Sequence, residues 1–506
     1  MCHTLACERE SMKCTQQLRH SSCPSRNGIH RILALFRHLF VLCLWFFNAG
    51  MQNPSWAAES PPNVLLLIVD DLRPDIGSYE VSYAQTPVID RLARNGRAFL
   101  RHYTQVPTCG ASRRALLSGL YPRTVSDLSN HAILANEGAW AQRSLPAVFR
   151  AHGYRTHALG KISHFPGGQS GEKWNCGPEE LPGAWDEHRV ALGPWPDPQA
   201  FMHGYAHGRA RRPGKSPVIE CADGPDEIYP DAWTAMAAVE TLEKLSTGKQ
   251  PWLLAVGFIK PHLPFAAPAS WHQKFTNTEI PEPNVRHKPA WPSGWHESGE
   301  MRKSYNHGGK DPDTDRAHAL ALRRAYAACV SYTDTQIGRV LGALEQSGQA
   351  QKTIVVLWGD HGFHLGEHGI WGKHCLFEEA LRSPLIIQVP GQVSAGTHCR
   401  AIVETVDIFP SLVDLCGLPA VPGLDGQSLR PWITKPETPT KKAAAAWWNG
   451  GQRTVRDDRW RLIVRDQDAR VELFDLATDP AASREVGTQY PAEVRRLRSL
   501  LPPAIR

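Results

Sequence analysis

One cysteine of this 506-residue chain stands in a setting that suits nucleophilic chemistry. It opens the run Cys109-Gly-Ala-Ser-Arg113, which predicts the start of a helix capped by Thr108 or Ser112. A helix N-terminus is positively polarised, so this terminus and Arg113 would stabilise negative charge at position 109. The residues alone leave two alternatives open, a buried structural cysteine and a plain cysteine nucleophile.

Polar residues also gather at the points where four predicted strands end. Each cluster alone is typical of a turn or a helix cap, but four at successive strand ends are hard to attribute to chance. The carboxyl ends of parallel strands share one edge of a sheet, where ligands bind. The sequence therefore predicts one site built from Asp70 and Asp71, Lys161 and His164, Lys260 and His262, and Asp360 and His361.

Three of these residues predict a metal site. Asp70, Asp71 and Asp360 offer hard carboxylate oxygens, which calcium and magnesium prefer. His361 is an unusual ligand for calcium, and by residue type alone it suits zinc or manganese. The residues therefore indicate the place of the metal and leave its identity open.

The elements that must position these residues alternate along the chain. Continuous apolar runs predict strands buried on both faces, and periodic stretches between them predict helices. This alternation predicts an α/β fold, with a large, mostly parallel sheet flanked by helices. The predicted strands are 63–69, 156–160, 252–259, 353–358 and 384–389, and the predicted helices are 86–96, 144–152, 231–245 and 317–346.

Two long stretches, 165–229 and 280–316, show no regular period. Loops of this length usually build a site, so we expect them to form walls of a substrate pocket. A stretch rich in Pro, Thr and Lys, 434–442, indicates a boundary, and short strands beyond it predict a small antiparallel sheet. The predicted division is a leader over 1–58, a catalytic domain over 59–436 and a small C-terminal domain over 437–506.

The leader has the features of a signal peptide. Basic residues precede the apolar run 39–47, and Ser55-Trp-Ala-Ala58 suits signal-peptidase cleavage, with Met12 as an alternative start. The run is short for a bilayer and no later segment has the apolarity of a membrane helix, so we expect no stable membrane insertion. Because the sequence has no Asn-x-Ser/Thr acceptor, we expect a periplasmic or secreted protein.

Cysteine number and charge narrow the function further. Of 12 cysteines, seven lie beyond the leader, and an odd number leaves at least one unpaired in an oxidising compartment. Cys109 is the candidate for the unpaired one, and Cys176 could pair with Cys221. The net charge of +6 is spread without concentrated Lys/Arg runs, which argues against a nucleic-acid partner.

The Cys109 run resembles the type I sulfatase signature, Cys-x-Pro/Ala-Ser-Arg with Leu-Thr-Gly downstream. Ala111 is an accepted variant, and Ser118 replaces the usual threonine. The resemblance covers about residues 62–500 and is closest to iduronate-2-sulfatases, which have a histidine where this chain has His361. It rests on the further stretches 63–74, 159–164, 256–265, 331–339 and 360–369.

This resemblance implies an alkaline-phosphatase-like sulfatase fold and a sulfuric ester hydrolase. It implies that a maturation enzyme oxidises Cys109 to formylglycine. One Ca²⁺, now favoured over zinc, would be held by that residue together with Asp70, Asp71, Asp360 and His361. One hydroxyl of the hydrated formylglycine would attack sulfur and release the sugar alcohol, and the other would help to expel sulfate.

The resemblance also assigns roles to the other residues. Arg113 and Ca²⁺ would favour the alkoxide. His164 would orient or deprotonate the hydrated aldehyde, and His262 would protonate the leaving oxygen. Lys161 and Lys373 would clamp the sulfate oxygens. The residues expected to contact the substrate are Lys161, Lys260, His262, Lys373 and His374.

The expected substrate is a sulfated oligo- or polysaccharide, with the 2-O-sulfated uronate of a glycosaminoglycan as the main hypothesis. Another sulfated polysaccharide is an alternative. So is a phosphodiester or phosphonate monoester hydrolase of the same superfamily. A non-catalytic carbohydrate-binding protein would keep Cys109 unmodified and would have lost the clamp residues, whereas every expected position is occupied.

Overall fold

The computed structural model describes one compact unit, which belongs to residues 59–506. The predicted leader with its alternative start lies outside the described residues, and so does Cys176 of the predicted Cys176–Cys221 pair. No described helix combines the length and apolarity needed to cross a bilayer. The described residues are 61–505 without 136, 166–173, 175–179, 289–298, 440–442 and 466–468.

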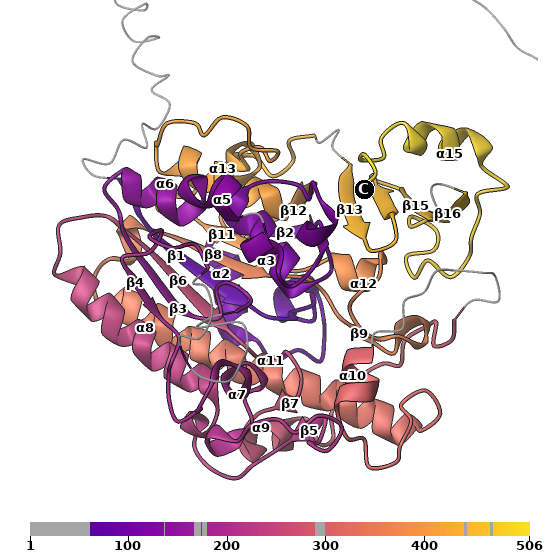
Figure 1. Ribbon diagram of the computed structural model, residues 1–506, viewed down its shortest axis with the longest axis horizontal. Coiled ribbons are helices and arrows are strands. Elements are labelled where there is room, and N and C mark those ends of the chain that lie inside the picture. Colours follow the sequence, from indigo (N-terminus) through magenta and orange to yellow (C-terminus); the bar gives the residue numbers. More distant parts are fainter. Residues whose placement is uncertain are drawn as a thin grey trace, which may run out of the picture. The chain divides into compact units, whose positions relative to one another are not determined.

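An eight-stranded sheet lies at the centre of this unit (Figure 1), in the order β12-β2-β11-β8-β1-β6-β3-β4. Neighbouring strands run parallel except at β11, which is antiparallel to both β8 and β2. The predicted mostly parallel α/β sheet is therefore confirmed. The strands are β1 (Asn63–Val69), β2 (Arg97–Tyr103), β3 (Arg155–Gly160), β4 (Glu187–Arg189), β6 (Trp252–Phe258), β8 (Thr353–Gly359), β11 (Leu385–Gln388) and β12 (His398–Glu404).

Helices cover both faces of the sheet (Figure 1). The strands β1, β6 and β8 are buried along their whole length, because apolar side chains on both faces pack against helices. On one face lie α2 (Pro87–Asn95), α8 (Pro230–Ser246) and α11 (Arg316–Gln346), and on the other lie α3 (Cys109–Ser118), α6 (Leu145–Ala151) and α13 (Ile408–Leu415).

A second sheet near the C-terminus is antiparallel, with the order β13-β14-β15-β16. This confirms the small antiparallel sheet predicted there, with β14 as an additional strand. The division at residue 436 stays a prediction, since both sheets belong to one compact unit. The bounds are β13 (Ala444–Trp448), β14 (Gln452–Arg456), β15 (Trp460–Arg465) and β16 (Arg470–Asp475), followed by α15 (Pro491–Arg498).

A buried charge cluster joins the small sheet to the large one. Glu378, at the start of α12 (Glu378–Leu381), lies 2.5 Å from Arg461 Nη2 and 3.3 Å from Arg456 Nε. Tyr103 at the end of β2 donates its hydroxyl to the other carboxylate oxygen. Burial opposes charge on Glu378, but Arg461 and Arg456 lower its pKa to about 2.

This cluster gives a prediction on stability. Because the pKa of Glu378 is lower in the folded than in the unfolded chain, its contribution is full above the unfolded value of about 4.3 and is lost as pH falls towards 2. Glu378→Gln should lower the free energy of unfolding by about 3 kcal/mol at pH 7 and by much less near pH 2. Urea unfolding of both proteins at the two pH values measures this.

The neighbouring residue supplies a matched control. Burial raises the pKa of Glu379 to about 7, so its charge does not stabilise the fold and Glu379→Gln should cost much less at pH 7. Equal losses for the two variants would contradict the assignment of the ion cluster as the source of the stability.

Candidate active site

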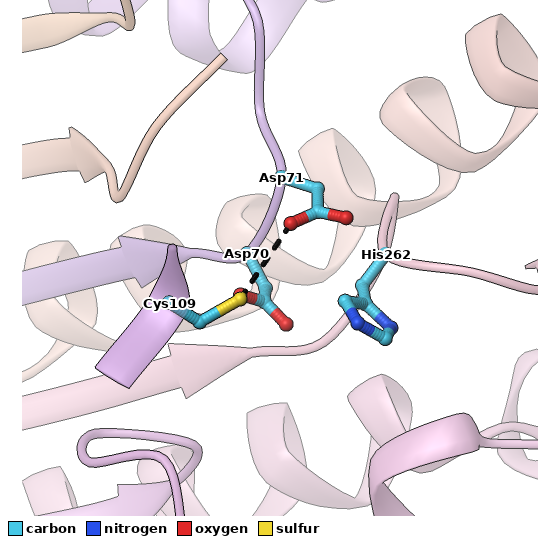
Figure 2. A group of neighbouring side chains, drawn as sticks. All are labelled: Asp70, Asp71, Cys109 and His262. Atoms are coloured by element: carbon cyan, nitrogen blue, oxygen red, sulfur yellow. Dashed lines mark hydrogen bonds between the residues drawn. The ribbon is translucent and has the colours of Figure 1, made fainter. Parts of the chain in front are cut away.

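Four strand ends meet at one edge of the large sheet, on either side of the central strand β1. Asp70 and Asp71 follow β1, and Asp360 and His361 follow its neighbour β8. The ends of β6 and β3 lie on the other side and lead to the remaining predicted pairs. Figure 2 shows Asp70, Asp71 and His262 beside Cys109, which comes from a helix rather than a strand.

Cys109 is the first residue of α3. The predicted side-chain cap is wrong, because the hydroxyl of Thr108 makes no capping bond and Ser112 donates to the carbonyl of Asp360 instead. A Cβ at Gly110 would lie 2.3 Å from the carbonyl oxygen of Asn130, so only glycine fits after the cysteine. The start of α3 is thus held tightly against Asn130 on one side and against the residue that follows β8 on another.

The sulfur of Cys109 lies at the centre of the polar residues. Its Sγ is 3.2 Å from His361 Nε2, 3.2 Å from Lys373 Nζ and 3.8 Å from Asp71 Oδ1. Burial and the charge of Asp70 raise the pKa of the Cys109 thiol well above its ordinary value. The surrounding protein groups therefore favour the neutral thiol over the thiolate. The sulfur nevertheless lies beside a lysine, a histidine and a carboxylate, as a nucleophile at this position would.

Arg113 is completely buried and connects two of the carboxylates. Its Nη2 lies 3.0 Å from Asp70 Oδ1 and 3.0 Å from Asp360 Oδ2. The same guanidinium donates to the carbonyls of Lys161 and Ile162, which fixes the end of β3 to α3. Burial opposes charge on Asp70, yet Lys161 and Arg113 hold its pKa well below the usual range. Asp70 is therefore a carboxylate.

Asp71 takes an unusual backbone conformation that aims its side chain at the cysteine. Its φ of 57° lies in the left-handed region, where a non-glycine residue must be held by its surroundings. The Asp71 amide donates to Asp360 Oδ1 at 2.9 Å, and Tyr326 donates its hydroxyl to the Asp71 carbonyl at 2.8 Å. The carboxylate oxygen Oδ2 is buried and has no hydrogen-bond partner among the described residues.

The ring of His361 is oriented for coordination. Its Nδ1 lies 2.9 Å from the carbonyl oxygen of Gly362, so this nitrogen must donate and Nε2 keeps its lone pair when the ring is neutral. Nε2 lies 3.3 Å from Asp71 Oδ1 and 3.7 Å from Asp360 Oδ1. In its neutral form the histidine therefore directs the lone pair of Nε2 towards the carboxylates of Asp71 and Asp360.

These residues fit a bound cation. Donor atoms of Asp70, Cys109, Asp360 and His361 all lie within 4.8 Å of one another, and the unpartnered Asp71 Oδ2 is close by. Buried carboxylates without a cation cost free energy, which a divalent ion would offset. His262 also falls within 4.8 Å of Asp70, Asp71 and Cys109. The edge of the sheet could therefore hold a metal ion, chiefly through oxygen ligands.

Two lysines flank the cysteine. Lys161 Nζ is ion-paired with Asp70, and Lys373 Nζ lies 2.7 Å from Asp71 Oδ1. Lys373 follows the short strand β10 (Trp371–Gly372), and both lysines are almost fully buried. Burial opposes charge on Lys373, but the charge of Asp71 raises its pKa well above its usual value. Two buried ammonium groups thus lie near position 109.

The loop after β6 carries His262 and is fixed from inside by Lys260. Lys260 Nζ donates to the carbonyls of His203, His262 and Pro264, at distances of 2.9, 3.2 and 2.8 Å. Asp231 of α8 accepts the amides of residues 259 and 260. Burial lowers the pKa of Lys260 to about 8. In this structure Lys260 positions the loop, and its contact with a substrate stays a prediction.

His164 and His374 are the last two residues predicted for the site. Burial, followed by the charge of Lys161, holds the pKa of His164 well below its ordinary value, so this imidazole is neutral. Its Nδ1 has no hydrogen-bond partner in the described part of the chain. The ring of His374 stacks on Trp448 of the small sheet, with centroids 5.0 Å apart and planes 18° apart. The small sheet therefore contacts the residue next to Lys373.

Two residues near His262 were not predicted. Glu300, in α10 (Gly299–Ser304), lies 3.3 Å from His262 Nε2 and 3.6 Å from Lys373 Nζ. His203, at the end of α7 (Pro198–His203), has its ring centroid 6.2 Å from that of His262 and bonds Tyr305. Both come from the aperiodic stretches that were expected to form pocket walls, which contain no pattern that could have singled them out.

The sequence matches two family profiles and several known proteins. The family profile described as sulfatase matches residues 62–418, and the profile described as N-sulphoglucosamine sulphohydrolase, C-terminal, matches residues 366–499. The iduronate 2-sulfatase of Mus musculus is 31% identical over 444 residues, covering 79% of this chain and 76% of the relative. A sulfatase of Formosa agariphila is 30% identical over 496 residues, covering 92% and 91%.

A solved structure of similar shape is the phosphonate monoester hydrolase of Agrobacterium radiobacter, with a TM-score of 0.68, 24% identity, and 87% and 96% of the two chains covered. The sheet topology and the sulfatase profile thus define an alkaline-phosphatase-like fold. The chain belongs to the sulfatase family and is a sulfuric ester hydrolase, and its resemblance to iduronate-2-sulfatases is confirmed.

Proposed function

We propose that this protein hydrolyses sulfate esters on a sulfated carbohydrate, and that its substrate is the 2-O-sulfated uronate of a glycosaminoglycan. The observation that carries this proposal is the position of Cys109 Sγ, 3.2 Å from Lys373 Nζ and among the carboxylates of a metal-type cluster. A nucleophile here faces two buried ammonium groups that suit the oxygens of one sulfate. The iduronate 2-sulfatase relative supports the uronate.

Position 109 needs more than a thiol for this reaction. Formylglycine made from Cys109 by a maturation enzyme would supply, as its hydrate, a hydroxyl nucleophile in place of the sulfur. Asp70, Asp71, Asp360 and His361 would hold one Ca²⁺, which would stabilise negative charge on that oxygen. Arg113 adds a positive charge beside the two carboxylates that it bridges.

The remaining residues bind the ester and move protons. Lys161 and Lys373 would hold the sulfate oxygens, and the neutral His164 would accept a proton from the hydrated residue. His262 would give a proton to the leaving sugar oxygen through Nε2, because its Nδ1 lies 2.7 Å from the Leu263 carbonyl and must donate there. His374 would contact the sugar from the rim.

The phosphonate monoester hydrolase neighbour defines the second candidate, a hydrolase of phosphodiesters or phosphonate monoesters. A phosphodiester and a sulfate monoester carry similar charge, so the two lysines alone do not separate them. Another sulfated polysaccharide is the third candidate. We also propose that the chain is exported to the periplasm or secreted, on the signal-peptide features of residues 1–58.

A panel of substrates tests the proposal. Sulfate release is measured from defined 2-O-, 4-O- and 6-O-sulfated oligosaccharides, alongside a bis-phosphodiester, with a Cys109→Ala preparation as the control for contaminating enzymes. We expect the 2-O-sulfated uronate to have a kcat/KM roughly 100-fold above the other sulfates. Faster turnover of the phosphodiester would contradict the sulfate assignment, and a different preferred sulfate would contradict the sugar.

A further inference from the structure

A carboxylate lies between two groups that are expected to act on the ester. Glu300 Oε1 is 3.3 Å from His262 Nε2, and Glu300 Oε2 is 3.6 Å from Lys373 Nζ. The side chain is only 24% exposed, and Oε2 is buried without a hydrogen-bond partner among the described residues. Glu300 therefore contacts the predicted proton donor and a predicted sulfate clamp at the same time.

Hydrogen bonding fixes which nitrogen of His262 faces this carboxylate. Nδ1 must donate to the carbonyl of Leu263 at 2.7 Å, so Nε2 is the nitrogen that points to Glu300. Lys260 fixes the backbone of the same loop through the His262 carbonyl. Only a ring that carries protons on both nitrogens satisfies both contacts, and that is the form a proton donor needs.

The charge of Glu300 is maintained by its neighbours. Burial opposes ionisation, but Lys373 and the hydrogen bond to His262 hold the pKa of Glu300 well below its ordinary value. Lys373 in turn has three electron-rich neighbours, namely Asp71, the Cys109 sulfur and Glu300. The Glu300 carboxylate thus lies beside the Lys373 ammonium group, which would also bind the sulfate.

We propose that Glu300 is a positioning residue: its carboxylate accepts the Nε2–H of His262 until the leaving oxygen takes its place at that hydrogen, and its charge weakens the hold of Lys373 on sulfate. This inference rests on the proposed sulfate ester hydrolysis. In that step sulfur bonds to the attacking oxygen, the bond between sulfur and the sugar oxygen breaks, and that oxygen takes the proton from His262 Nε2. Glu300 neither accepts nor donates a proton in this step.

The two parts of this role predict effects of opposite sign in Glu300→Gln. An alcohol is a poor leaving group and needs the proton, whereas an activated phenol leaves without it. Turnover of an alkyl sulfate should therefore fall roughly tenfold or more beyond any fall with 4-nitrophenyl sulfate. Inorganic sulfate should bind roughly threefold tighter by calorimetry, because a negative charge beside Lys373 is gone.

If Glu300 only supported the local structure, its replacement would lower the turnover of both esters and weaken sulfate binding. Equal falls with the two esters, or weaker sulfate binding, would overturn the inference. Glu300→Asp retains the charge but not the reach, so it should bind sulfate as the unaltered protein does and still lose alkyl sulfate turnover. That variant decides the question if the glutamine variant fails to fold. Lys303→Gln, an exposed position on the same helix, is the matched control and should change neither quantity.

The readouts separate this inference from the proposed function. If the unaltered protein hydrolyses no sulfate ester, the proposed function fails, while the calorimetric comparison still judges the contact between Glu300 and the sulfate clamp. If it hydrolyses sulfates but Glu300→Gln leaves the alkyl-to-aryl ratio unchanged, the proposed function stands and the role of Glu300 is overturned.

Discussion

Cys109→Ser is expected to lower multiple turnover of a sulfate ester at least about 1000-fold and to leave sulfate covalently attached at position 109. A serine hydroxyl at the start of α3 still faces Lys373 and the carboxylates, so it can attack sulfur once. It lacks the second hydroxyl of a hydrated aldehyde, and a serine sulfate hydrolyses slowly. Intact-protein and peptide mass spectrometry after incubation with substrate would detect the added SO₃ group.

The same spectra of the unaltered protein identify the residue at position 109. Formylglycine in active enzyme is the expected result, and an unmodified thiol in fully active enzyme would contradict the proposed nucleophile. Cys416→Ser is the matched control, because Cys416 is also buried but follows α13 and does not belong to the cluster around Cys109. It should gain no sulfate and keep the turnover of the unaltered protein.

Asp71→Asn is expected to remove both the activity and the stabilisation by calcium. Asp71 offers a buried oxygen without a partner, and it lies between His361 and Lys373. Saturating Ca²⁺, at about 1000 times its dissociation constant, should add about 4 kcal/mol to the unfolding free energy of the unaltered protein. The variant should gain almost none, and its turnover should fall at least about 1000-fold.

Thermal and urea unfolding with calcium or with a chelator measure this effect without relying on turnover. Asp334→Asn is the control, because Asp334 is another buried carboxylate, bonded to the amides of Val88 and Ile89 and outside the cluster. It should keep the calcium-dependent gain. Stabilisation by zinc in preference to calcium would contradict the proposed ion.

The central strands could be predicted because burial on both faces leaves unbroken apolar runs, as in β1 and β8. The outer strands could not. β2 contains Arg97, whose guanidinium is buried against two backbone carbonyls, and β12 mixes polar and apolar residues. The direction of β11 was also beyond prediction, because an apolar run indicates burial and not which way the strand runs.

In the site, too, the residues that follow a local sequence pattern could be predicted, and those placed by tertiary contacts could not. Asp70 and Asp360 lie at the ends of buried strands, so topology alone brings them together. The predicted cap was wrong because Ser112 donates to the carbonyl of Asp360, which follows a distant strand, and the buried hydroxyl of Thr108 has no hydrogen-bond partner among the described residues. Glu300 follows no periodic stretch, and its partners His262 and Lys373 are fixed only by the folded chain.

The stacking of His374 on Trp448 makes the position of this histidine depend on the small sheet. The ring that flanks Lys373 rests on β13, while the carboxylates and Cys109 rest on the large sheet and α3. Changes in β13 can therefore alter the surroundings of His374 without disturbing the carboxylates and Cys109. Under the proposed function, substitutions in β13 would therefore change substrate preference and leave the hydrolytic step as it is.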